Sequence, residues 1–384
     1  MKKSDIFWQT YLKIEKELLE VAKYIYVTDE KIVNHNSQKY TSQLETFSPY
    51  IADLIIRTCI EIEAISKELY FDFGGTKTRG SKEIFFDEDC LKLLDIKCQT
   101  HKKVVLLSCL SFNLTKEENT VFKPLREAHK RQGTDWEKAY QALKHDRYSS
   151  ICKGTIKNLI HALAALYLLN IYYRDVKLNS KYLEVSNLDF SFGSAIFSIK
   201  PPNHNYVIDV INGKEFDDIL VSDDSPYILK YVDSTYKAVI EAYKENIEEQ
   251  NKYILSQPEF KEPEFKKIVK EGLQKEKENP RERFIYIWEL CKYRLNKKTP
   301  SNLSYEKRKQ LFLSSNEWNG RIRKNNKHKS AEELTPENIQ AEINSAAICA
   351  GMELEQQFRS MRMQKAYKEG YCELIIDKGN IKYN

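Results

Sequence analysis

Glycine and proline are scarce in this sequence, with 12 and 10 copies among 384 residues. A turn-rich all-β chain needs more of both, because these residues supply the backbone conformations of tight turns. Charged residues make up 30% of the chain and hydrophobic residues 41%, which is typical of a folded protein and argues against long disordered tracts. The composition therefore predicts a mainly helical fold, and the length predicts two or three domains.

Paired cysteine spacings are also absent from the sequence, and we expect neither a signal peptide nor a membrane span. The eight cysteines form no C-x-x-C pair, so we expect neither a metal site nor a disulfide framework, and reduced thiols indicate a cytoplasmic protein. No nucleotide-binding glycine motif is present, and we expect no cofactor. Charged residues interrupt the first turns, where a signal peptide would need a continuous apolar core. The apolar run LIHALAALYLLNIYY at 159–173 is shorter than the roughly 20 residues that cross a bilayer, so it predicts a buried core helix and no membrane contact.

Positive charge is concentrated in one segment. Between Cys291 and Ser330 the sequence has twelve lysines or arginines and two glutamates, a net charge of +10, whereas the whole chain carries +5 and the remainder therefore −5. Clustered cations bind phosphate-rich partners by releasing counterions, which makes this basic segment 291–330 a candidate nucleic-acid-binding region. A solvated helical surface is the alternative. The cations that we expect to contact nucleic acid here are Arg321, Lys324, Lys327 and Lys329.

Apolar residues that recur every three or four positions predict a series of helices. Ser48-Pro49 should begin one that runs to Tyr70, because proline is favourable in a first turn. Thr134 should cap another, and Gly154 separates that helix from the apolar helix 155–173, as in two antiparallel helices around a tight turn. Further helices are expected at 228–255, 262–278, 281–296 and 303–314, and a long final one from Thr335 to near Gly370.

Three segments predict strands. KVVLLSCLSF at 103–112 should pair with TVFKPL as a small β insert. Residues 182–211 alternate between apolar and polar types and are bounded by turn residues, which predicts a strand pair or small meander. The last residues, YCELIIDKGNIKYN, predict a hairpin that turns at Lys378-Gly379.

Four ionisable residues stand in a row where the helix after Thr134 ends: Lys144, His145, Asp146 and Arg147. Three helical turns separate Arg147 from Trp136, so we expect Arg147 close to the core, with His145 and Lys138 on another face. A histidine can take or give a proton at neutral pH, and a fixed arginine can hold a phosphate and its developing charge. Because RNA supplies its own 2′-hydroxyl nucleophile, this group could cleave RNA without a metal. The alternative is a solvated helix end, where cations are favoured by the helix dipole.

The run DWEKAYQALKHDRYSSICKGTIKNLIHALAALYLL resembles the core of the HEPN-like helical families, in which a W-x-x-A-Y-N-x-x-K-H-x-R helix precedes an apolar helix rich in glycine or alanine. The upstream helix IRTCIEIEAISKELY and the PL of VFKPL are similar to parts of the same bacterial proteins. The resemblance covers roughly 48–175. It implies a helical bundle, a homodimer, and in many members a metal-independent endoribonuclease of toxin–antitoxin, CRISPR-linked or abortive-infection systems.

The sequence departs from the family's nuclease motif, which is an arginine followed after four to six residues by a histidine. Before His145 only Lys138 stands at such a spacing, and lysine lacks the bidentate fork with which arginine clamps a phosphate. Either Arg147 or Arg57 supplies a guanidinium in the folded bundle, or the bundle has lost catalysis. The motif itself occurs once elsewhere, as Arg323 to His328 in RKNNKH, which is an alternative catalytic pair or a basic loop that faces nucleic acid.

These observations predict a mainly α protein with a HEPN-like bundle at 1–175, a small β-rich segment at 176–228 and a helical C-terminal domain at 229–384. We expect a metal-independent endoribonuclease that acts on tRNA or mRNA, in antiphage defence or as a toxin. Its catalytic residues would be His145, Arg147, Lys138 and Arg57, with Lys144 contacting RNA. Its partners would include a phage-encoded trigger or a neighbouring antitoxin or defence protein. The alternative is a non-catalytic HEPN-like sensor or scaffold that binds a phage component, nucleic acid or a partner nuclease.

Overall fold

A computed structural model describes residues 2–30, 42–80, 84–130, 133–202, 224–279, 284–318 and 333–379. The chain divides into two compact units: unit 1 is Met1–Asp233 with Gly370–Asn384, and unit 2 is Ser234–Glu369. This division differs from the three parts expected from the sequence. The strands of the expected β-rich segment belong to unit 1, and so does the last strand of the chain.

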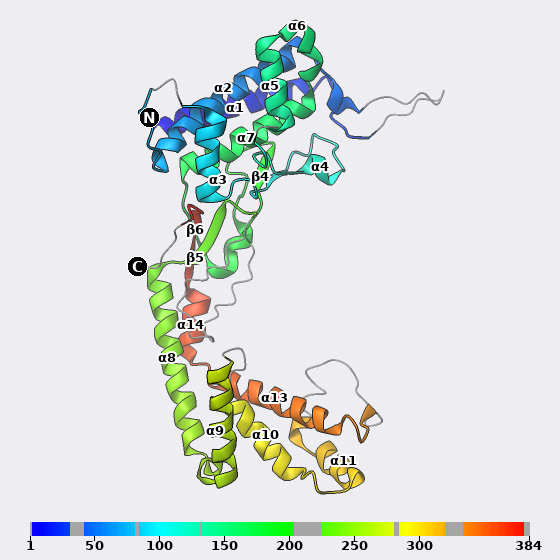
Figure 1. Ribbon diagram of the computed structural model, residues 1–384, viewed down its shortest axis with the longest axis vertical. Helices are drawn as coiled ribbons and strands as arrows, with labels where there is room; N and C mark the ends of the chain where they lie inside the picture. The colour runs from blue at the N-terminus through cyan, green and yellow to red at the C-terminus, as the bar shows by residue number, and fades with distance from the viewer. Residues whose placement is uncertain are drawn as a thin grey trace, which may run out of the picture. The chain divides into compact units, whose positions relative to one another are not determined.

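Unit 1 is built around one apolar helix, α7 (Ile156–Arg174), which packs against three others (Figure 1). From Leu159 to Tyr172 nearly every residue of α7 is buried, as expected of a helix that is hydrophobic all round. The helices of unit 1 are α1 (Lys3–Val21), α2 (Pro49–Asp72), α3 (Lys92–Cys98), α4 (Glu117–Thr120), α5 (Asp135–His145), α6 (Arg147–Ser150) and α7. In the described ranges no helix combines the length and apolar character that a membrane crossing requires.

The starts of the main helices are specified by local sequence. The Ser48 and Thr155 hydroxyls accept hydrogen bonds from the N–H of the third residue of α2 and of α7, at 3.1 and 3.2 Å. Such caps each stabilise a helix by about 1 kcal/mol. Gly154 precedes α7 where the chain passes α2, and a Cβ at this position would lie 2.8 Å from the Cβ of Ala52. The predicted beginnings at Ser48-Pro49 and Thr134 and the role of Gly154 as a separator are confirmed.

Two small antiparallel sheets complete unit 1. The first has the strand order β2 (Val121–Phe122), β1 (Val105–Leu107), β4 (Phe197–Ile199), which confirms the predicted pairing of the two segments. The second has the order β3 (Leu178–Lys181), β6 (Tyr371–Ile376), β5 (Tyr227–Tyr231). The predicted C-terminal hairpin is wrong, because β6 is the central strand and both of its edges are already paired.

Unit 2 is an insertion between two paired strands, because β5 leads into it and β6 follows it. Its helices are α8 (Asp233–Ser256), α9 (Pro263–Glu278), α10 (Tyr286–Lys298), α11 (Tyr305–Leu313), α13 (Ile339–Gln357) and α14 (Met361–Glu369). Two predicted helix bounds are wrong. Residues 227–231 form β5 because β6 offers them a partner. The long final helix breaks between Gln357 and Met361, where the Ser360 hydroxyl accepts a hydrogen bond from the Met363 N–H at 3.0 Å and caps α14.

Buried polar contacts tie distant parts of unit 1 together. The Glu15 carboxylate, 3% exposed on α1, accepts hydrogen bonds from the Tyr11 and Ser194 hydroxyls and from the N–H groups of Ala195 and Ile196. These bonds fix the turn before β4 against α1. The expected fold class, mainly α with small β inserts, is confirmed by these elements.

Candidate functional site

Helix α5 ends at His145, two residues before Arg147, to which we expected it to run. Asp146 interrupts the helix, and its carboxylate accepts a hydrogen bond from the Ser149 N–H at 3.1 Å, which caps the short α6. The same backbone hydrogen bond lowers the pKa of Asp146. Arg147 therefore begins a new helix, and its side chain is exposed. Our expectation that Arg147 lies close to the core is wrong, because it assumed a continuous helix through Asp146.

Four histidines fall in the described ranges, and His145 differs from the other three. His101 Nδ1 lies 2.6 Å and His129 Nε2 lies 3.5 Å from the Asp95 carboxylate, so both face the same anion. Burial lowers the pKa of His161 to about 4, which keeps it neutral at pH 7. His145 is exposed and has no side-chain partner within the described part of the chain. It is thus the histidine among these four that a substrate could reach without displacing a protein contact.

The cations expected around His145 are placed very differently. Arg147 is exposed and, like His145, has no side-chain partner in the described ranges. Lys138 Nζ lies 3.5 Å from Asp135, an exposed pair that is worth little. Lys144 Nζ lies 4.0 Å from Glu63 Oε1 and 5.2 Å from the centre of the Tyr140 ring. Lys144, His145 and Arg147 thus lie exposed around the end of α5, whereas Lys138 lies near its beginning.

Arg57 is not part of this group in the described contacts. Its guanidinium forms a bidentate pair with Glu17 of α1, in which Nη1 lies 3.0 Å from Oε1, and its Nε lies 3.2 Å from Asp53. The hydrogen bond from Arg57 lowers the pKa of Glu17. These contacts join α1 to α2 and engage both Nη groups with Glu17, so Arg57 would have to leave two carboxylates before it could bind a phosphate.

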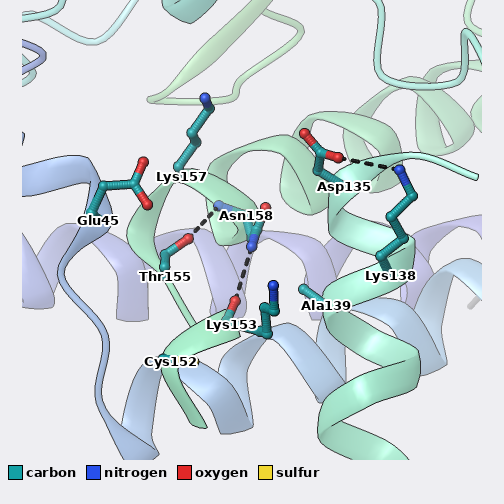
Figure 2. A pocket seen from close by; sticks show the side chains of 9 residues that line it. All are labelled: Glu45, Asp135, Lys138, Ala139, Cys152, Lys153, Thr155, Lys157 and Asn158. Carbon is teal, nitrogen blue, oxygen red and sulfur yellow. Dashed lines mark hydrogen bonds and ion pairs between the residues drawn. The ribbon is translucent and has the colours of Figure 1, made fainter. Parts of the chain in front are cut away.

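A pocket of about 360 Å³ lies between α5 and the first turn of α7 (Figure 2). Asp135, Lys138 and Ala139 contribute from α5, and the remaining lining residues are Glu45, Cys152, Lys153, Thr155, Lys157 and Asn158. The Asn158 amide donates to the Lys153 carbonyl at 2.9 Å, which orders the turn before α7. Three lysines face two carboxylates, so the pocket suits an anionic group. Lys153 and Lys157 were not among the predicted site residues, although both flank the predictable helix start at Thr155.

The basic segment 291–330 is largely neutralised where the structure describes it. Lys292 pairs with Glu289 of its own helix, and carboxylates from other segments pair with Arg294, Lys297 and Lys298. Arg308 and Lys309 donate to backbone carbonyls. Of the seven lysines and arginines between 291 and 318, only Lys307 has no partner in the described ranges. The net charge of +10 therefore overstates the field of this segment. The predicted residues Arg321, Arg323, Lys324, Lys327, His328 and Lys329 lie outside the described residues.

Glu137 is a buried carboxyl in the helix that carries the site. Its Oε2 accepts hydrogen bonds from the Thr134 N–H and hydroxyl, at 2.7 and 2.9 Å, and closes a capping box at the start of α5. Burial raises its pKa from 4.5 to about 7, against these two hydrogen bonds, which lower it. The folded protein therefore holds this proton more tightly than the unfolded chain does.

Glu137→Gln is expected to change how stability depends on pH. A raised folded-state pKa gives stability that is fully present below pH 4.5 and is lost as the pH rises through about 7. Glutamine keeps a hydrogen-bond acceptor and does not ionise. At pH 8 the variant should therefore unfold at a higher denaturant concentration than the wild type, with a free energy of unfolding larger by up to about 3 kcal/mol. Denaturation curves at pH 5 and pH 8 would measure this, with Asp135→Asn, an exposed neighbour, as the control. A variant less stable than the wild type at pH 8 would contradict the prediction.

Comparison with known proteins gave no match: no family model fits the sequence, and no curated protein or solved structure is similar to it. Within the described ranges, no cluster of three or more histidine, cysteine, aspartate or glutamate side chains is arranged to hold a metal ion. The end of α5 offers an accessible imidazole, an unpaired guanidinium two residues later, and lysines on the same helix.

Proposed function

We propose that this protein is a metal-independent endoribonuclease of the HEPN type, which acts in the cytoplasm in antiphage defence or as a toxin. The observation that carries the proposal is that His145 and Arg147 are both exposed and have no partner in the described ranges. Among the four described histidines, His145 alone combines these properties. Burial of both residues against α7 would have favoured a scaffold instead.

In the proposed reaction, the RNA 2′-hydroxyl attacks the adjacent phosphorus. The P–O2′ bond forms and the P–O5′ bond breaks, which leaves a 2′,3′-cyclic phosphate and a 5′-hydroxyl. His145 takes the proton from the 2′-hydroxyl as general base or gives one to the leaving 5′-oxygen as general acid. Arg147 contacts the phosphate, on which negative charge grows in the transition state. A homodimer, which the HEPN resemblance implies, would supply a second imidazole for the other proton transfer.

Lys138 and Lys144 would add favourable charge for the RNA backbone. We leave Arg57 out of the proposed site, because its contacts with Glu17 and Asp53 occupy the guanidinium. The RNA substrate would be tRNA or mRNA, and the trigger would be a phage component or a neighbouring antitoxin.

An infection assay tests the biological part of the proposal. Cells that express the wild type should survive phage challenge better than cells that express His145→Ala, or should stop growing where the variant does not. His101→Ala is the matched control, since it removes an imidazole that contacts Asp95 instead. Equal protection by the wild type and His145→Ala, with cellular RNA intact, would contradict a nuclease.

A non-catalytic sensor or scaffold is the second candidate. It is favoured by the pairing of Arg57 with Glu17 and of Lys138 with Asp135, which leaves Arg147 as the one guanidinium of the proposed set that is free in the described ranges. In that case the same infection assay should show protection that does not depend on His145, together with binding to a phage component or to a partner nuclease.

A further inference from the structure

Tyr148 is an exposed aromatic side chain beside the proposed catalytic residues. It follows Arg147 in α6, and 93% of its surface is accessible, with no ring or hydrogen-bond partner in the described ranges. His145, Arg147 and Tyr148 thus present an imidazole, a guanidinium and a phenol ring within four consecutive positions. An aromatic ring exposed next to cations is the combination that binds a base and its phosphate together.

The chain that follows Tyr148 leads directly to the pocket between α5 and α7. Cys152 and Lys153 line that pocket, as do Lys157 and Asn158 in the first turns of α7. Lys138 reaches it from α5, seven residues before His145, which is about 10 Å along a helix axis. The segment 145–158 therefore carries the proposed catalytic pair, an open ring and a lysine-lined pocket in one continuous stretch.

The charges in this pocket favour a phosphate. Asp135 is matched by Lys138, whereas Lys153 and Lys157 have no carboxylate partner in the described ranges. Glu45 is the remaining carboxylate of the lining. Two unmatched ammonium groups against one carboxylate attract a backbone phosphate, and the pocket volume of about 360 Å³ lies within the range of small-ligand sites.

We infer that the substrate is an unpaired RNA strand, which stacks one base on Tyr148 and places a neighbouring phosphate in the pocket of Lys138, Lys153 and Lys157. This inference rests on the proposed function and adds the class of RNA. Bases in an A-form duplex stack on one another and cannot reach a protein ring, whereas bases in loops and single strands can. Tyr148 is thus a specificity residue that selects loops and single strands.

Binding of a labelled single-stranded RNA of about 12 nucleotides tests this inference. Measured by fluorescence anisotropy in a His145→Ala background, which blocks cleavage, the added change Tyr148→Ala should weaken binding about 5- to 100-fold. Tyr148→Phe should keep the affinity, because phenylalanine retains the ring. A blunt RNA duplex of the same sequence should bind more weakly and respond little to Tyr148→Ala. Tyr24→Ala, which removes a tyrosine of similar exposure, 87%, is the matched control.

The lysine pocket has a separate signature. Replacing Lys153 and Lys157 together by alanine should flatten the dependence of log affinity on log salt by about 0.7, because the pocket holds one phosphate and each phosphate neutralised in a single strand contributes about 0.7. Tyr148→Ala should leave that slope unchanged. Binding that is indifferent to Tyr148, or duplex binding as tight as single-strand binding, would overturn this inference alone. Absence of RNA binding by the His145→Ala parent would overturn the proposed function and this inference with it.

Discussion

Replacing His145 by alanine is expected to slow RNA cleavage by about 10²- to 10⁴-fold, the usual contribution of a positioned general acid or base. The expectation follows from the accessibility of His145 and from its lack of a partner in the described ranges. The helix end does not depend on this side chain for its contacts, so the variant should fold like the wild type. The measurement is the first-order rate of cleavage of a labelled RNA with enzyme in excess.

Two further variants separate catalysis from folding in that assay. Arg147→Ala should slow cleavage by about 10²- to 10³-fold, because it removes a charge from the transition-state phosphate. Arg57→Ala should affect stability more than rate, because its described contacts are with Glu17 and Asp53. A wild-type rate for His145→Ala, or a loss in Arg57→Ala as large as in His145→Ala, would assign the chemistry to other residues.

Replacing Lys103 by methionine is expected to destabilise unit 1 by about 3–5 kcal/mol, the cost of leaving one charge of a buried pair uncompensated. Lys103 precedes β1 and is 1% exposed, and its Nζ donates to Asp377 Oδ2 at 2.9 Å. Asp377 follows β6 and is 7% exposed, so the pair joins the first sheet to the end of the second. Chemical denaturation followed by circular dichroism would measure the loss.

The double variant Lys103→Met, Asp377→Asn tests the cause of that loss. Asparagine carries no charge and keeps an oxygen that can accept the Gly379 N–H, at 3.0 Å from the Asp377 Oδ1 in the wild type. If the penalty comes from the uncompensated carboxylate, the double variant should recover most of the lost stability, and the two changes should not be additive. A single variant that loses less than about 1 kcal/mol would show that the pair contributes little.

The helices of unit 1 could be predicted from sequence because their signals are local. The hydroxyls of Ser48, Thr134 and Thr155 cap their helices, and the apolar run of α7 predicts a fully buried helix. The strands were harder, since β5 and β6 become strands through pairing with partners far along the chain. Nothing in the sequence near Tyr371 indicates that β3 and β5 pair with the two edges of β6, so the predicted hairpin was wrong.

The candidate site was predictable in its residue types and not in its arrangement. His145 and Arg147 could be found from their place at a helix end, but the break at Asp146 depends on a hydrogen bond to Ser149 that competes with helix continuation. Glu17, Glu259 and Glu262, which pair with Arg57, Arg294 and Lys297, come from other helices and turns, so these pairs could not be seen in the sequence. Tyr148 had no distinguishing pattern, and its exposure became evident only in the fold.

The chemical ends of the RNA products test the proposed mechanism most directly. With EDTA in excess, wild-type protein should cut single-stranded RNA and leave 2′,3′-cyclic phosphate and 5′-hydroxyl ends, because the 2′-hydroxyl is the nucleophile and no metal takes part. Under the same conditions His145→Ala should leave the RNA intact, and His101→Ala should cut it as the wild type does. Intact RNA with the wild type, cleavage that requires a divalent metal, or products with 3′-hydroxyl and 5′-phosphate ends would contradict the mechanism.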